Sequence, residues 1–135
     1  MPGTIDGQPG QAGQAAHAGH GGHGVLAAAI SNGIVGLLHS YTGRGPVRAR
    51  TTIDDNLIVC VLGATLTKAE QALVENGKDK VVLRGRRAIQ DTLADDAISL
   101  VEELTDRDVV AFMSNNHIDP DLAVEIFVLA PVATD

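Results

Sequence analysis

One short segment of the chain carries side chains that could bind a cation or transfer a proton. His117, Asp119 and Asp121 place an imidazole and two carboxylates within five positions, and these groups suit a hard or borderline cation or acid-base chemistry. The same segment is rich in turn formers, among them Asp119-Pro120. The sequence favours a structural turn and leaves a small metal- or ligand-dependent enzyme as an alternative.

Arginines cluster on and after a glycine-containing turn. Gly43, Arg44, Gly45, Arg48 and Arg50 could together surround a small anion such as bicarbonate or phosphate with backbone amides and guanidinium groups. The GRGP segment lacks the lysine and the following Ser or Thr of a Walker loop. The alternative for Arg48 and Arg50 is a solvated strand face.

The N-terminal segment contains a third group, in which His17, His20 and His23 are three positions apart and could wrap Zn, Ni or Cu. Incidental chelation by a low-complexity tail is the alternative. The single cysteine, Cys60, lies in an apolar run and predicts a small buried hydrophobe rather than a nucleophile. We expect no cofactor.

Composition narrows the classes of partner. The chain has 135 residues, a formal net charge of -7 and only three aromatic side chains, two Phe and one Tyr. Acidity and a lack of stacking side chains disfavour nucleic-acid binding, which stays open only through the basic segments. The stretch 25–41 is interrupted by Ser31, Asn32 and His39, and the N-terminus lacks a signal-peptide pattern. We expect a soluble cytoplasmic protein without direct membrane insertion.

The elements that must position these groups follow from residue periodicity. Residues 1–24 predict a disordered Gly/Ala/His-rich tail, residues 25–131 a single domain, and 132–135 a short tail. A helix is expected over 25–41. A line of small residues beside its apolar stripe predicts close packing against another backbone; the line comprises Ala29, Gly33, Gly36 and Ser40.

Two hairpins and further helices complete the predicted fold. Strands are expected over 47–53 and 57–62, then a short helix after a Thr67–Glu70 capping box, an interruption at 76–77 and a long helix over 78–104. Strands over 109–113 and 122–128 flank a linker at 115–121, and Phe112 and Met113 are expected in the core. The order predicts a two-layer α+β fold, with a four-stranded antiparallel sheet and helices on one face.

Charge order along the long helix suggests a second copy. Its first part is basic and its later part acidic, which opposes the helix macrodipole. Two copies crossing antiparallel would bring the basic half of each against the acidic half of the other. We therefore expect a homodimer that salt weakens, and a solvated helix with local pairs such as Arg87 with Asp91 is the alternative.

Several motifs in a fixed order resemble one family. GRGP, LTxAE, VAFMS and DPDLAVExFVL lie between about residues 25 and 130, and together they resemble the bacterial MpsC family. The resemblance implies a component of a sodium-translocating, membrane-potential-generating system, associated with inorganic-carbon uptake and with membrane transporter subunits. It implies no established catalytic residues.

The sequence as a whole favours an accessory or regulatory protein. We expect it to act by protein contact, and through small-anion sensing at the arginine cluster, because no catalytic groups converge in the sequence. The alternatives are the enzyme that would use the His117 loop and a nucleic-acid-binding module.

Overall fold

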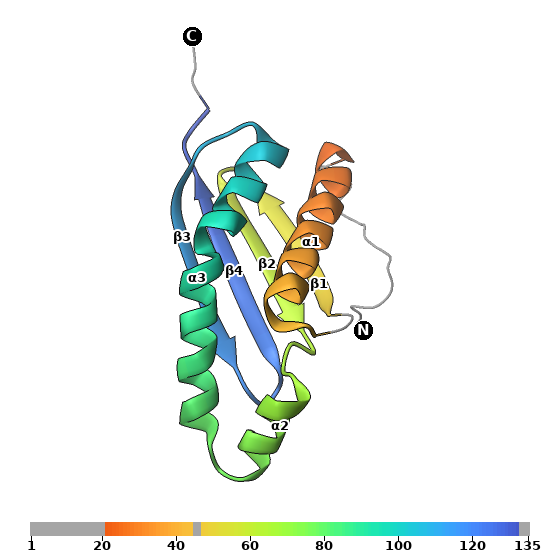
Figure 1. The fold of residues 1–135 in the computed structure, drawn as a ribbon. Coiled ribbons are helices and arrows are strands. Elements are labelled where there is room, and N and C mark those ends of the chain that lie inside the picture. The colour runs from red at the N-terminus through yellow and green to blue at the C-terminus, as the bar shows by residue number, and fades with distance from the viewer. Residues whose placement is uncertain (1–20, 45–46, 133–135) are drawn as a thin grey trace.

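The protein is a two-layer α+β domain. A computed structural model describes residues 21–44 and 47–132. Its elements are α1 (Gly21–Thr42), β1 (Arg48–Asp54), β2 (Leu57–Gly63), α2 (Lys68–Glu75), α3 (Asp79–Thr105), β3 (Val109–His117) and β4 (Leu122–Leu129) (Figure 1). The four strands form one antiparallel sheet in the order β1-β2-β4-β3. The predicted fold class is confirmed.

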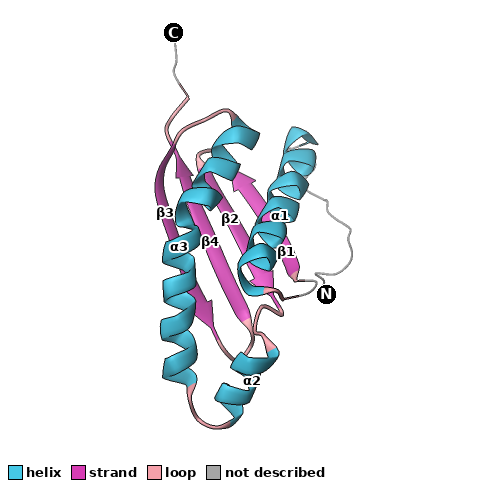
Figure 2. Cartoon of the chain, in the orientation of Figure 1, coloured by secondary structure: helices cyan, strands magenta, loops and turns pink. Residues whose placement is uncertain are grey.

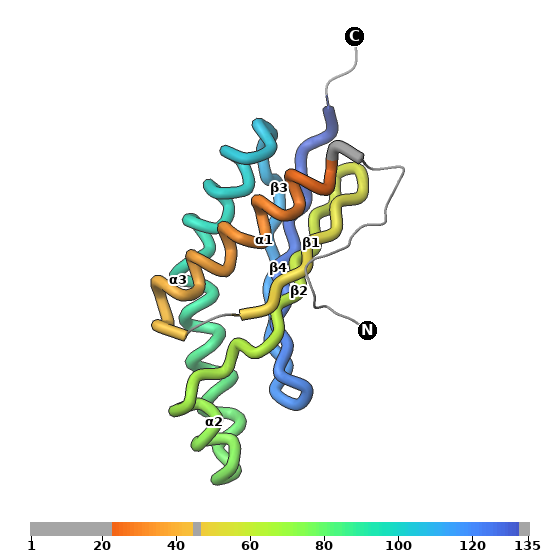
Figure 3. Tube along the Cα trace, turned by 90° about the vertical axis from the view of Figure 1, so that its right-hand side faces the viewer, coloured from red at the N-terminus to blue at the C-terminus, as the bar shows by residue number. Residues whose placement is uncertain are grey.

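The helices cover only one face of the sheet. Seen edge-on, the sheet has α1, α2 and α3 on the same side (Figure 3), and Figure 2 shows α1 and α3 lying across the strands. The core lies between these layers and is built around Phe127, Ile30, Ile58, Leu62 and Val101, all at most 1% exposed. One face of every strand is therefore covered.

The first helix is longer than expected. It begins at Gly21, so residues 21–24 belong to a helix rather than to the predicted tail, and residues 1–20 lie outside the described part of the chain. Ile30, Ile34 and Leu38 recur every four positions and are buried. The helix ends where Gly43 adopts φ +70° and its N–H donates to the carbonyl of His39.

One member of the small-residue line, Gly33, makes its close contact within a single chain. A Cβ added at Gly33 would lie 2.7 Å from Cδ2 of Leu100 on α3, whereas one at Gly36 would meet nothing within 4 Å. Glycine at position 33 therefore lets α1 pack closely on α3. The expected close packing is an intramolecular contact at this position.

Among the described residues, one helix is long and apolar enough by composition to cross a membrane. It spans His23–Thr42, with a mean hydropathy of 1.3, and the core helix of a soluble protein passes the same test of length and composition. The same helix packs its Ile30, Ile34 and Leu38 side chains into the core. Its polar residues, such as Asn32 and His39, lie on the exposed side. The helix thus contacts the sheet through a narrow stripe of side chains, and other apolar residues, such as Val25, stay exposed.

The second hairpin departs from the prediction at its turn. β3 runs through His117, so the turn is confined to residues 118–121 and the expected linker over 115–121 was too long. Asn115 pairs with Val124, and the Asn116 side-chain amide donates to Oε1 of Gln90 on α3 at 2.9 Å. Partners of this kind hold turn-forming residues in a strand, because the ladder and a side-chain hydrogen bond satisfy them.

The connection between the layers forms as predicted. Thr67 and Glu70 make a reciprocal capping box at the start of α2. Gly77, at φ +75°, interrupts the chain before α3. α3 ends at Thr105, where Asp106 adopts a left-handed conformation.

Candidate functional site

The face of the sheet opposite the helices is apolar, and no element within residues 21–44 and 47–132 covers it. We call it the open face. Its centre consists of side chains from β2 and β4 that alternate with the buried ones, and β3 adds two more; the set is Leu57, Val59, Val61, Leu122, Val124, Ile126, Val128, Ala111 and Met113. None of these residues carries a charge. Contiguous exposed apolar patches larger than a few hundred Å² are typical of interaction sites, which makes this face the candidate surface.

Exposure measures how open this face is. Leu57 is 41% exposed, Val61 38% and Met113 51%. The prediction that Met113 belongs to the core was therefore wrong. Its neighbour Phe112 points the other way and packs on Phe127 of the core, with ring centroids 5.0 Å apart. Alternation along β3 separates the two side chains.

Polar and charged residues flank the open face along the two edge strands. Arg48 and Arg50 lie near the start of β1 and Asp54 at its end, all on the exposed side. On the opposite edge, β3 contributes Asn115 and His117. The apolar centre therefore has a basic corner, an acidic corner and one edge without an acid.

Sequence analysis missed the open face although its signal was present. The run Leu57–Leu62 is apolar at both alternating sets of positions, a pattern that indicates a central strand. β2 is central, but helices cover only one side of a two-layer fold. Apolar residues on both sides of a strand in such a fold therefore leave one apolar set outside the core of the described chain.

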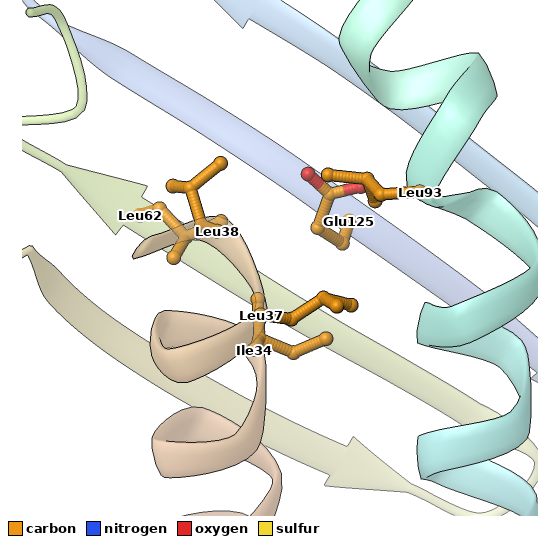
Figure 4. Close-up of a pocket in the computed structure, with 6 residues that line it drawn as sticks. All are labelled: Ile34, Leu37, Leu38, Leu62, Leu93 and Glu125. Atoms are coloured by element: carbon orange, nitrogen blue, oxygen red, sulfur yellow. The ribbon is translucent and has the colours of Figure 1, made fainter. Parts of the chain in front are cut away.

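A buried acid lies under the helix layer. Glu125 on β4 is 4% exposed and points into a small pocket beneath α1 and α3, lined also by Ile34, Leu37, Leu38, Leu62 and Leu93 (Figure 4). Its Oε1 has no hydrogen-bond partner. The cavity of about 10 Å³ is close to the space that one water molecule requires.

Burial changes the protonation of this acid. Removal from water raises the pKa of Glu125 to about 7, against the opposing effects of the Gln90 amide and the Arg87 charge. The carboxyl therefore exchanges a proton near neutral pH. A metal would need more ligands, and the part of the chain that the structure describes contains no group of three or more His, Cys, Asp or Glu side chains placed to hold one.

A buried arginine connects three segments. Arg86 on α3 is 3% exposed and makes an ion pair with Glu70 of α2 at 2.7 Å. It also donates to the carbonyl oxygen of Thr65. Burial by itself would raise the pKa of Glu70, but Arg86 and the Thr67 N–H outweigh it and lower that pKa. Sequence analysis counted this position only as part of the basic first half of the long helix, because periodicity alone does not show that α2 folds back onto α3.

Other charges of α3 also have partners within the chain. Arg87 lies 3.8 Å from Asp91, as the local-pair alternative expected. Asp96 accepts a hydrogen bond from the Tyr41 hydroxyl at 2.9 Å, and Glu102 accepts one from the N–H of Val109. The predicted pairing of α3 with a second copy stays a prediction.

The turn that carries His117, Asp119 and Asp121 is held by hydrogen bonds. Asp121 accepts from the backbone N–H and hydroxyl of Thr65 and from the N–H of Leu66, at 2.9 to 3.1 Å. Nδ1 of His117 lies 2.9 Å from the carbonyl oxygen of Pro120, and Asp119 is exposed. Asp121 thus joins the β3–β4 turn to the loop before α2.

The arginine cluster is divided among different partners. Nε of Arg44 donates to the carbonyl of Leu66 at 3.0 Å. The Arg48 guanidinium lies over Gly63, where an added Cβ would be 3.4 Å from it, and Arg50 is exposed. Gly43 ends α1, and Gly45 lies outside the described residues. The anion site stays a prediction.

The remaining candidate residues are the three N-terminal histidines and Cys60. His23 lies in the first turn of α1, and His17 and His20 lie outside the described residues, so the metal prediction stays untested. Burial raises the pKa of the Cys60 thiol to about 12, with a Thr51 hydrogen bond opposing it and the Glu125 charge adding to it. This thiol is therefore neutral, as its sequence context indicated.

Comparison with protein-family models gives one match, over residues 23–131. The model describes the Na+-translocating membrane potential-generating system (MpsC). The chain belongs to the MpsC family. No curated protein and no solved structure matches it. The matched residues include the four strands and the three helices, apart from the first two residues of α1. Family membership suggests a role for this MpsC protein in the Na+ membrane-potential system.

Proposed function

We propose that this MpsC protein is a non-catalytic accessory or regulatory component of the Na+ membrane-potential system, and that it acts by contact with other proteins. The system comes from family membership. The mode of action comes from the open face, an uncharged sheet surface on which Leu57, Val61 and Met113 are each more than a third exposed. Such a surface contributes free energy only when another molecule covers it.

The polar residues that an enzyme would use support this proposal. Both carboxylate oxygens of Asp121 accept hydrogen bonds, one from Thr65 and one from Leu66. Cys60 is a buried neutral thiol. Glu125 exchanges a proton near neutrality, but it lies in a cavity with room for about one water. These placements support protein contact rather than catalysis as the mode of action.

Purification from the native host in mild detergent tests the function. We expect a polytopic membrane protein to copurify with the full-length chain in stoichiometric amount. His117→Ala and Asp119→Ala should leave that association unchanged, because both residues lie in an exposed turn. Asp121→Ala is unsuitable as a probe, since it would remove three hydrogen bonds. Turnover of a defined compound that is lost in His117→Ala or Asp119→Ala would establish the enzyme alternative instead.

The proposal extends to the cellular process and location. We propose that the protein serves inorganic-carbon uptake from the cytoplasmic side, peripheral to the membrane through its partner. The family resemblance supports the process, and the packing of α1 into the core supports a peripheral location. A deletion strain should grow poorly in air and recover at elevated CO2; equal growth of wild type and deletion strain in air would contradict this part of the proposal.

A further inference from the structure

We propose that a second copy of the chain covers the open face, related to the first by a two-fold axis that lies in the interface and runs across the strands. This inference rests on the proposed function in one respect: both take the open face as a protein-protein interface. The result is a four-layer dimer in which two sheets pack face to face and the helices lie outside. Aligned sheets pack in this way about 10 Å apart.

The pairing of the strands arranges the open face in rows. Arg48, Gly63, Leu122 and His117 form the row at one end, because each is registered with the next. Asp54, Leu57, Val128 and Ala111 form the row at the other end. A two-fold axis across the strands places the first row of one copy over the second row of its partner. The Arg48 guanidinium, which lies over Gly63, then faces Leu57 of the partner, which is 41% exposed.

Charge complementarity selects this axis. Arg48 and Asp54 lie six residues apart on β1, about 20 Å along an extended strand, so they cannot pair with each other. The proposed axis brings Arg48 of each copy to Asp54 of the other, giving two symmetric ion pairs at the rim. An axis along the strands would place β1 over β3, where Arg48 would face His117 and no acid. The self-complementary β1 edge therefore indicates a second copy in antiparallel orientation.

The rest of the chain offers no alternative cover. Residues 1–20 and 133–135 contain only two large apolar side chains, Met1 and Ile5. The apolar surface that needs a partner extends over three strands. Two side chains cannot cover it.

The area of the open face sets the expected affinity. Four strands at about 4.8 Å spacing and seven residues at about 3.3 Å rise give roughly 440 Å² for each copy. The total of roughly 900 Å² is near the lower limit for specific interfaces. We therefore expect a dimer with a micromolar dissociation constant rather than an obligate one.

Charge reversal at the rim gives the decisive experiment. Arg48→Asp alone places acid against acid in both ion pairs, and Asp54→Arg alone places base against base. Each should raise the dissociation constant about tenfold at low salt. Mixing the two variants makes both contacts attractive again, so a heterodimer should form with near wild-type affinity. Sedimentation equilibrium from about 1 to 100 µM, with one variant carrying a fluorescent label, measures all three.

Variants at the apolar centre provide a second test. Val61→Lys should abolish dimerisation, and Val61→Thr, which keeps the branched shape that strands favour, should weaken it. Leu83→Lys on α3 is the matched control, since Leu83 is 39% exposed and Val61 38%. Circular dichroism checks that each variant is folded. Equal dimerisation of the Val61 and Leu83 variants would overturn the inference.

The outcomes separate this inference from the proposed function. A wild-type monomer at 100 µM, or a mixture of Arg48→Asp and Asp54→Arg that stays monomeric while wild type dimerises, rejects the second copy or its geometry. If Val61→Lys then also loses a copurifying membrane protein that Leu83→Lys retains, the proposed function stands and that protein covers the open face. A dimer restored by mixing with no copurifying membrane protein supports the inference and rejects the function. Binding of the monomer to vesicles of phosphatidylcholine and phosphatidylglycerol, lost in Val61→Lys, rejects both.

Discussion

The two faces of the sheet are built from the same strands, but one face is buried and the other is exposed. On the inner face, the helices bury Ile58, Cys60 and Phe127 completely, and even a carboxyl group, Glu125, is enclosed. On the outer face, Leu57 and Val61 lie beside those residues in sequence and stay exposed. The difference teaches that apolar character alone does not identify the core of this protein. The number of layers decides which apolar residues are covered within one chain.

Substitutions at two neighbouring residues of β2 test the difference between the inner and outer faces. They have the largest expected effect on stability. Ile58→Ala removes a side chain that is 0% exposed and should destabilise the fold by about 2 to 5 kcal/mol. Leu57→Ala removes one that is 41% exposed, and should cost less than about 1 kcal/mol at concentrations where the chain is monomeric. Urea denaturation of both variants measures the difference. Similar losses for the two would show that the outer face is also covered within the monomer.

A second pair of neighbours tests the polar contacts of the helix layer. Arg86→Met leaves Glu70 and the Thr65 carbonyl without their partner, and should destabilise the fold by about 3 kcal/mol. Arg87→Met removes an exposed pair with Asp91 and a solvent-exposed hydrogen bond to the carbonyl oxygen of Ser114, and should change stability by only about 1 kcal/mol. Thermal denaturation at matched pH compares them. If Arg87→Met were the more damaging change, the assignment of Arg86 as the link between α2 and α3 would be wrong.

The buried acid adds a pH dependence that the outer face lacks. Glu125 has a pKa of about 7 in the folded state against 4.5 in the unfolded chain, so the folded state binds more protons between these values. Stability therefore falls as pH rises from about 4.5 to 7 and changes little from this source above that range. Glu125→Gln removes the effect and should stabilise the fold by about 3 kcal/mol at pH 8, with almost no effect at pH 4.5.

Chemical denaturation at several pH values checks this prediction. Glu103→Gln is a suitable control, because Glu103 is an exposed acid on the same helix. A gain for Glu125→Gln that is constant from pH 4.5 to 8 would show that titration of this carboxyl is not its cause.

The fold was predictable because its signals are local. The capping box at Thr67, the interruption at Gly77 and the alternation along β1 each depend on a few adjacent residues. The roles of Arg86 and Asp121 were not predictable in the same way. Their partners, Glu70 and Thr65, lie 16 and 56 residues away, and only the folded chain brings them together.

The open face was predictable only in part, because its residues could be recognised in the sequence but their exposure could not. Its residues were visible in the sequence as apolar positions on both sides of β2, but their exposure depends on the absence of a second helix layer in the described part of the chain. Met113 shows the consequence, because side-chain type alone placed it in the core and it is 51% exposed. The arginines likewise needed the strand register before Arg48 and Asp54 could be recognised as opposite ends of one edge.

The contact between Gly33 and Leu100 bears on how the chain is made. The two residues are 67 positions apart, and ribosomes add about 5 to 20 residues each second. The first helix therefore leaves the ribosome roughly 3 to 13 s before the helix that packs on it. During that interval the nascent chain displays a helix whose length and composition match a membrane span. A cell that makes this protein must keep that segment from aggregating until α3 has been synthesised. It must also keep the segment away from the machinery that inserts helices into membranes.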